Sequence, residues 1–400
     1  MSLLAVDEAL AQILKGVRPL GSEEVPLSSA GGRVLSGPLR AQRAQPPFAA
    51  SAMDGYAVRA ADIAEVPATL KVIGEAPAGH GFSARVGRAS AVRIFTGAPM
   101  PKGTDTVVMQ ENTVAGKDTV TVLETARPGN FVRNAGLDFK KGETLLPGFT
   151  VMGARQIGLA AAMNHARVAV VRRPSVALLA TGDELVDPGA APRDDQIISS
   201  NTLAIAAMIA RYGGEPLDLG IIPDKAARIE KAIERAAGVD VLVTIGGASV
   251  GDHDLVQAAM EKSGVKIGFW KIAMRPGKPL MFGRRGNQRV IGLPGNPVSA
   301  MVCTRLFILP LIARMTGNTC SFDPVTAVLG SGMGANDQRQ DYVRATLARG
   351  DQGQLVATPF PKQDSSMQRV FAAADCLIIR PPHAPASEAG ERVQVLLLDF

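Results

Sequence analysis

The stretch Val241–Asp254, with the sequence VLVTIGGASVGDHD, constrains the fold more than any other part of the chain. Its first five residues are apolar or β-branched and stop at a Gly-Gly pair, and Leu255–Lys262 then has the pattern of a helix. A buried strand that leads through a glycine turn into a helix is typical of an open α/β sheet, which binds ligands at the carboxyl ends of its strands. The glycines let backbone N–H groups approach an anion, and Asp252 and Asp254 offer oxygen ligands for a metal such as Mg²⁺.

The same arrangement recurs through residues 172–322, where strands alternate with helices of about 10–15 residues and so predict a doubly wound parallel sheet. The polar turns after the strands are TGDEL (181–185), PD (223–224), GGASVGDHD (246–254), RPGKP (275–279) and LPGNP (293–297). Because the carboxyl ends of parallel strands share one edge, that edge is expected to gather Asp183, Glu184, Asp224, Asp252, Asp254, Arg275 and Lys278. Carboxylates beside cations and glycine turns match a metal-bridged phosphate or another oxyanion.

Two other motifs are incomplete. Residues 247–251 match the G-x-S-x-G of a nucleophile elbow between a strand and a helix. A serine hydrolase also needs a later Asp and His, but His253 lies too close in the sequence and His383 lies in a Pro-rich turn of another domain. The RPGKP turn is similar to a P-loop, but proline follows its lysine where a P-loop has Ser or Thr. We therefore interpret Ser249 as a ligand contact and not as a nucleophile.

The length of 400 residues predicts several domains, at about 100–200 residues each. Residues 1–43 and 144–171 are expected to form an N-terminal helix (3–16) and a mixed linker domain. Residues 44–143 have the short-strand pattern of an inserted β-rich domain, 172–322 form the α/β domain, and 323–400 form a C-terminal small β-barrel or sandwich. The predicted fold class is thus α/β plus β, in several domains.

Composition excludes several function classes. The net charge of +6 is dispersed, and one Trp and three Tyr leave few aromatic side chains to stack on bases, so we expect no nucleic-acid partner. Cys303, Cys320 and Cys376 form no CxxC, which argues against disulfides and zinc and favours a cytoplasmic protein. The amphipathic N-terminus is not a signal peptide, and the most apolar helix, Ser299–Met315, is interrupted by an Arg and a Pro, so we expect no membrane span.

Eight motifs together resemble the MoeA family, the molybdopterin molybdenumtransferases, which also includes the gephyrin E-domain. They are SAMDGYA (51–57), FTGAP (95–99), VRNAGLD (132–138), TGDEL (181–185), SSNT (199–202), GGASVGDHD (246–254), RPGKP (275–279) and GLPGNPVSA (292–300). The resemblance implies four subdomains, with 172–322 as the molybdopterin-binding domain, and an elongated homodimer with a composite active site. The implied reaction inserts molybdenum from molybdate into adenylylated molybdopterin and releases AMP with the help of Mg²⁺. The implied partners are a molybdopterin adenylyltransferase and molybdoenzyme-maturation proteins.

The resemblance also implies roles for individual residues. It implies that Glu184, Asp224 and Asp254, with Asp252 in support, hold Mg²⁺ and position the phosphates, and that Arg275 and Lys278 bind the molybdate or phosphate anion. It implies a second subunit that contributes Asp54, Thr96, Arg133 and Asp138. Contacts to molybdopterin, phosphate or molybdate are implied for Thr181, Gly182, Ser200, Asn201, Gly246, Gly247, Ser249, Gly251, Pro294, Pro297 and Arg344. Position 275 is Arg where several members of the family carry Lys, and the planar fork of Arg differs from the point charge of Lys.

Three hypotheses remain open on the sequence. The first is this transferase. The second is a non-catalytic molybdopterin-binding or scaffold protein, and the third is a nucleotide hydrolase built on the same type of sheet.

Overall fold

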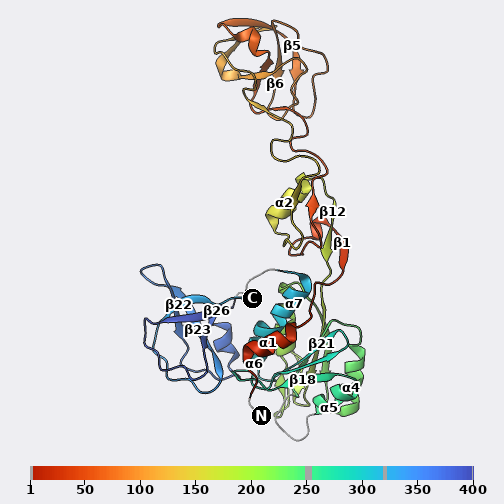
Figure 1. The fold of residues 1–400 in the computed structure, drawn as a ribbon, viewed down its shortest axis with the longest axis vertical. Helices are drawn as coiled ribbons and strands as arrows, with labels where there is room; N and C mark the ends of the chain where they lie inside the picture. Colours follow the sequence, from red (N-terminus) through yellow and green to blue (C-terminus); the bar gives the residue numbers. More distant parts are fainter. Residues whose placement is uncertain (1–2, 248–254, 319–321, 399) are drawn as a thin grey trace. The chain divides into compact units, whose positions relative to one another are not determined.

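The computed structural model describes residues 3–247, 255–318, 322–398 and 400. The chain divides into two compact units, one formed by Met1–Glu23 with Val171–Phe400 and the other by Glu24–Val170 (Figure 1). The expected multidomain α/β plus β organisation is confirmed, whereas the predicted subdomain boundaries at 43, 143, 171 and 322 stay predictions.

The first unit is built on a six-stranded sheet with the order β16-β13-β17-β21-β20-β18. The strands are β13 (Ser175–Thr181), β16 (Glu215–Ile222), β17 (Val241–Ile245), β18 (Lys266–Trp270), β20 (Met281–Arg285) and β21 (Gln288–Leu293). The strands from β16 to β21 in this order run parallel, whereas β20 is antiparallel to both β21 and β18. The sheet is therefore mixed and not all parallel, because the short turn between β20 and β21 can only join antiparallel neighbours. Since β18 runs with the parallel strands, its carboxyl end lies on their edge.

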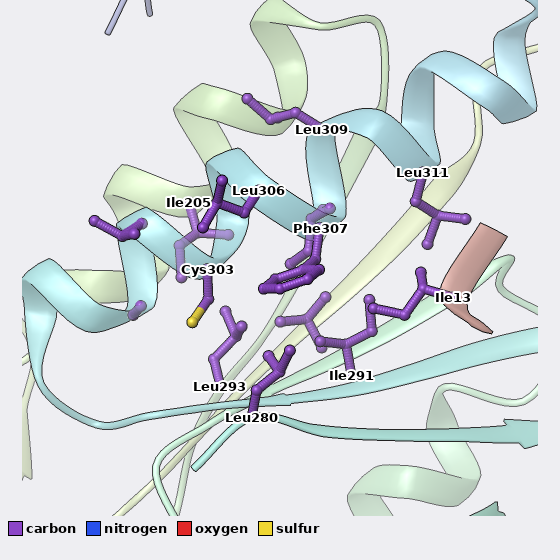
Figure 2. Packing of buried hydrophobic residues seen from close by; sticks show 14 of the residues in the cluster. Ile13, Ile205, Leu280, Ile291, Leu293, Cys303, Leu306, Phe307, Leu309 and Leu311 are labelled. Atoms are coloured by element: carbon purple, nitrogen blue, oxygen red, sulfur yellow. The ribbon is translucent and has the colours of Figure 1, made fainter. Parts of the chain in front are cut away.

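Helices cover both faces of this sheet. They are α1 (Val6–Leu14), α3 (Asn201–Arg211), α4 (Ala226–Arg235), α5 (Leu255–Lys262), α6 (Pro297–Cys303) and α7 (Leu309–Thr316). Side chains alternate along β13, so that Val176 and Leu178 pack with α1, α3, α6 and α7, while Ala177 and Leu179 pack with α4 and α5. Figure 2 shows the first core, in which Phe307 and Ile205 point toward Leu280 and Ile291 of the sheet side. Burial on both faces explains the continuous apolar runs of β13 and β17.

Helix α1 packs on the α/β layer, which differs from its expected place with the linker domain. Val6, Ala9 and Ile13 are buried in the same core as Ile291 and Phe307, and α1 contacts α7. The amphipathic pattern predicted the helix correctly, but it carries no information about which apolar surface the helix covers.

The apolar helix Pro297–Thr316 is the one segment of the described chain that is long and apolar enough to cross a membrane, and 83% of its apolar window is buried inside the protein. A π-helical segment, Thr304–Ile308, separates α6 from α7. Pro310 does not break the helix because it lies in the first turn of α7, where the missing N–H costs little.

The C-terminal segment forms a closed barrel, so of the two folds that the sequence predicts for it, a small barrel or a sandwich, the barrel is the one observed. Its strands are β22 (Val325–Leu329), β23 (Gln340–Arg349), β24 (Leu355–Pro359), β25 (Cys376–Arg380) and β26 (Arg392–Leu397). β23 pairs with both β24 and β25 and so closes the ring. The short strand β19 (Met274–Arg275) of the α/β segment adds to β23. A short helix, α8 (Gln368–Ala372), was not predicted.

The second unit holds a six-stranded sheet with the order β7-β4-β6-β5-β9-β8, as the short-strand pattern predicts. Its strands are β4 (Gly55–Val58), β5 (Ala68–Ala76), β6 (Ser90–Ile94), β7 (Thr106–Met109), β8 (Thr113–Ala115) and β9 (Thr119–Val122). The rest of residues 22–171 contributes β1 (Ser22–Pro26), β2 (Leu39–Arg40), β3 (Ala50–Ser51), β10 (Val132–Arg133), β11 (Thr144–Leu146), α2 (Ala154–Ala162) and β12 (Arg167–Val171).

Candidate functional site

A cavity of about 690 Å³ opens at the carboxyl edge of the α/β sheet. Every parallel strand contributes to its wall through the turn that follows it, as the sequence predicts. The lining includes Thr181, Gly182 and Glu184 after β13, Asp224 after β16, Gly246 and Gly247 after β17, and Pro294, Gly295, Asn296 and Pro297 after β21. Ser199, Ser200 and Asn201 at the start of α3 complete one side. Of the predicted site, the structure thus brings together the residues from these turns.

Carboxylates gather at this edge. Glu184 and Asp224 both line the cavity, and the carboxylate of Asp183 accepts a hydrogen bond of 3.2 Å from the backbone N–H of Asp224. Burial raises the pKa of Asp224, and the negative charges of Asp183 and Glu184 raise it further. Like charges held close together in this way suit a cation, which would neutralise them.

Glycine is required at the end of β17 for steric reasons. Gly247 has a φ of +66°, and a Cβ there would lie 2.2 Å from Cγ2 of Val256 and 3.0 Å from Oγ1 of Thr181. A Cβ on Gly246, whose φ is +89°, would lie 2.7 Å from the carbonyl oxygen of Thr181. The backbone of β17 therefore approaches β13 more closely than any side chain allows, which leaves its peptide groups at the cavity wall.

Two polar side chains lie at the wall of the cavity with unused hydrogen-bonding capacity. Asn201 donates from Nδ2 to the carbonyl oxygen of Gly295 at 2.7 Å, which directs its Oδ1 elsewhere. This Oδ1 and Oγ1 of Thr181 are buried and have no hydrogen-bond partner within the described parts of the chain. Buried polar atoms are normally paired, so both atoms are candidates to contact a polar ligand.

The anion ligands expected in the RPGKP turn lie apart from this cavity wall. Arg275 lines a separate hollow in the barrel and donates to Asp341 from Nε at 2.9 Å and also from Nη2. Lys278 is exposed, and its neighbour Pro279 does line the main cavity. The Arg275 guanidinium is therefore engaged by a carboxylate in this structure, and its role as an anion ligand stays a prediction.

Arg344 is also engaged within the protein. Its side chain is almost fully buried, and it donates to Oε1 of Gln363 and to the carbonyl oxygen of Asp364, both at 2.9 Å. In this conformation it anchors the segment after β24 and offers no surface to a ligand. A direct contact with molybdate stays a prediction that this geometry does not support.

Four predicted site residues, Ser249, Gly251, Asp252 and Asp254, lie outside the described residues. Within the described ranges, no three His, Cys, Asp or Glu side chains come together as a metal site. Glu184 and Asp224 are thus the part of the predicted metal-ligand set that the structure places, on one cavity wall.

The second unit holds the other predicted site residues. The carboxylate of Asp54 accepts hydrogen bonds from the backbone N–H and the hydroxyl of Thr96, at 2.7 and 2.8 Å. These bonds, the backbone one first, lower the pKa of Asp54, whose side chain is exposed. The carboxylate is therefore ionised and held in one orientation.

Backbone hydrogen bonds also join the three motifs of this unit. The N–H of Gly97 donates to the carbonyl of Ser51 at 2.9 Å, and the N–H of Ala52 donates to that of Phe131 at 2.8 Å. Arg133 pairs with Ala50 across β10 and β3, and is exposed. Asp138 is also exposed, and its backbone N–H donates to Gln45. SAMDGYA, FTGAP and the start of VRNAGLD thus form one surface.

Sequence reasoning missed the contribution of the barrel to the main cavity. Ser366 lines it, and the neighbouring Ser365 accepts a hydrogen bond of 2.9 Å from Nδ2 of Asn296. Gln368, at the start of α8, donates to the hydroxyl of Ser200. The QDSSMQ segment has the composition of an ordinary loop, and the site that it joins lies more than 60 positions earlier in the sequence, so the pattern held no signal.

Comparison with known proteins agrees with this architecture. A model of the MoeA N-terminal region (domain I and II) matches residues 4–164, one of a probable molybdopterin binding domain matches 177–314, and one of the MoeA C-terminal region (domain IV) matches 326–398. Molybdopterin molybdenumtransferase of Haemophilus influenzae is 35% identical over 398 residues, which cover 98% of each chain. The chain belongs to the MoeA family.

Further members of the MoeA family support this assignment. The molybdopterin molybdenumtransferase of Bacillus subtilis is 35% identical over 405 residues, which cover 99% of this chain and 94% of that protein. A crystal structure of a molybdopterin biosynthesis MoeA protein from Pyrococcus horikoshii superposes with a TM-score of 0.87 at 30% identity and full coverage of both chains. The MoeA-like fold that the eight motifs imply is therefore confirmed.

Proposed function

We propose that this chain inserts molybdenum from molybdate into adenylylated molybdopterin and releases AMP. One observation supports the proposal above the others. In a chain whose relatives over the whole length are named molybdopterin molybdenumtransferase, a cavity of about 690 Å³ lies at the sheet edge where open α/β folds bind ligands. Ligand pockets of drug-sized molecules have volumes of about 300–1,000 Å³, so the cavity is large enough for a nucleotide-linked pterin.

Mg²⁺ suits the carboxylates on this wall. Glu184 and Asp224 offer hard oxygen donors, and the pKa of Asp224 is raised first by burial and then by the negative charges of Asp183 and Glu184, which a divalent cation would neutralise. We infer that these two residues hold the metal, with Asp252 and Asp254 as the further ligands that the family resemblance implies. When bound, Mg²⁺ neutralises charge on the phosphates and polarises the bond to be broken.

The remaining residues of the wall bind and orient the substrate. The backbone at Gly246 and Gly247 lies open to the cavity and is suited to phosphate oxygens. Oδ1 of Asn201 is an acceptor, and it suits an N–H group of a pterin or an adenine. Oγ1 of Thr181 can donate to an oxyanion.

We further propose that the enzyme works as a cytoplasmic homodimer whose second subunit supplies Asp54, Thr96, Arg133 and Asp138 to the cleft. The geometry of the second unit supports a functional role for Asp54, because an exposed carboxylate with two fixed donors and a lowered pKa stays ionised and is oriented to hold a water molecule. An adenylyltransferase that activates molybdopterin would supply the substrate.

The test is AMP release by purified protein given adenylylated molybdopterin, molybdate and Mg²⁺. The proposal predicts AMP in proportion to the molybdenum cofactor formed, and a loss of both in Asp54→Ala and Asp224→Asn. Wild-type protein that binds the pterin nucleotide without releasing AMP would contradict it and point to a carrier or scaffold. Phosphate release from ordinary nucleotides without pterin would point to a hydrolase instead.

A further inference from the structure

The loop Ile272–Leu280 lies between two cavities of the first unit. Arg275 lines the hollow of about 460 Å³ in the C-terminal barrel, whereas Pro279 lines the main cavity. Two backbone hydrogen bonds close the loop at its base, from the N–H of Ile272 to the carbonyl of Lys278 at 2.9 Å and from the N–H of Lys271 to that of Leu280 at 3.0 Å. Because the loop is closed, a displacement at Arg275 reaches Lys278 and Pro279 within a few bonds.

The barrel holds this loop through Arg275. β19 pairs in parallel with the start of β23, so that Arg275 lies opposite Asp341. The guanidinium donates twice to Oδ2 of Asp341, and it lies 3.4 Å from Oδ2 of Asp337. The side chain of Arg275 is 49% exposed, and its guanidinium is held by the carboxylate of Asp341, whose side chain is only 10% exposed.

Within the described residues, the side-chain hydrogen bonds of Asp341 are those from Arg275. Its Oδ1 is buried and has no hydrogen-bond partner in the described residues. Burial raises the pKa of Asp341, and the bonds from Arg275 oppose that shift. A buried carboxylate with only one oxygen hydrogen-bonded lowers the stability of the fold. We therefore explain the burial of Asp341 by its effect on the position of Arg275.

On the side away from the barrel, the loop packs tightly against the protein core. Gly277 has a φ of +114°, and a Cβ there would lie 2.6 Å from Sγ of Cys303 in α6 and 3.0 Å from Cε of Met274 in β19. Cys303 is fully buried, and Figure 2 shows it in the core beside Leu280 and Leu293. The core therefore blocks inward movement, and the contact between Arg275 and Asp341, together with the backbone pairing of β19 and β23, opposes outward movement.

We propose that Asp341 is a positioning residue, which fixes the loop Ile272–Leu280 through Arg275 and so positions Pro279, which lines the main cavity, and the adjacent Lys278. For its effect on catalysis the inference rests on the proposed function. It assigns Arg275 to the link between barrel and loop, and it leaves Lys278, whose side chain is exposed, as the cation of this loop that is available to an anionic substrate.

A double-mutant cycle tests whether Asp341 acts through Arg275. The variants are Asp341→Asn, Arg275→Gln and the pair, each assayed for kcat and for the KM of molybdate. Each single variant is expected to raise KM by roughly tenfold, as loss of a charge-assisted hydrogen bond does, with kcat within about twofold. The double variant should match Arg275→Gln, because Asp341→Asn has no contact with the guanidinium left to remove once Arg275 is replaced. Additive effects, or kcat and KM unchanged in Asp341→Asn, would overturn the inference.

Amide hydrogen exchange provides a readout that does not depend on activity. Exchange of the segment Ile272–Leu280 should become faster in Asp341→Asn and also in Arg275→Lys, which keeps the charge but loses the fork. Asp351→Asn is the control, since Asp351 is exposed in the turn at the far end of β23. Unchanged exchange in both test variants refutes the positioning role, whereas faster exchange without AMP release by the wild type would refute the proposed function alone.

Discussion

Gly247→Ala tests the steric argument at the end of β17. A residue with a side chain at a φ of +66° costs about 1–2 kcal/mol. The new Cβ would also lie 2.2 Å from Cγ2 of Val256, which is buried in the core between the sheet and α5. Overpacking of this kind costs about 1–3 kcal/mol, so we expect Gly247→Ala to lower the free energy of unfolding by about 2–5 kcal/mol.

Gly238→Ala is the matched control for this variant. Gly238 has a φ of +92°, but a Cβ there would meet no atom within 4 Å. Only the backbone cost of about 1–2 kcal/mol is expected. Trp270, the one tryptophan of the chain, lies in β18 of the same sheet, so urea unfolding can be followed by its fluorescence. Equal losses of stability in Gly247→Ala and Gly238→Ala would refute the claim that contact with Val256 requires glycine.

Three further variants address the ion pairs and the second unit. Asp240 accepts hydrogen bonds from both Nη atoms of Arg172; burial would raise its pKa, but these bonds and those from Ser175 together lower it. Because the pKa of Asp240 is lower in the folded state, its ionised form stabilises the fold above the unfolded pKa near 3.8, and this stabilisation is lost as the pH falls through the folded pKa. Asp240→Asn should therefore lower the free energy of unfolding by about 1–3 kcal/mol at pH 7 and by less below pH 3.8. A loss of stability that does not change with pH would contradict this. Asp54→Ala should slow AMP release by at least roughly 100-fold with an unchanged Tm, and a rate near that of the wild type would exclude Asp54 from the chemistry. Thr96→Val removes the hydroxyl donor of Asp54 and should shift the acid limb of the pH–rate profile to higher pH, because loss of that bond raises the pKa of the carboxylate.

The sequence predicted those parts of the site that follow from local pattern. Glu184, Asp224 and Gly246 each follow a strand of the parallel part of the sheet, and parallel strands place such turns on one edge by geometry alone. The hairpin of β20 and β21 could be read from the Gly286-Asn287 turn between them. The short-strand pattern also predicted the β-rich character of residues 44–143 and of the C-terminal segment.

What the sequence could not predict depends on contacts between distant segments. The pairing of Arg275 with Asp341 joins residues 66 positions apart, and it requires that β19 adds to the barrel. The placement of α1 on the α/β core, and of Ser366 at the main cavity, likewise depends on which apolar surfaces dock. Periodicity tells which face of an element is buried, but it does not name the partner that buries it.

A crystal structure of the protein soaked with adenylylated molybdopterin and molybdate is the most direct test of the central claim. We predict that the pyrophosphate lies in the cavity of about 690 Å³, against the backbone of Gly246 and Gly247 and beside a cation held by Glu184 and Asp224. A nucleotide bound in the barrel hollow near Arg275, with the main cavity empty, would contradict the account.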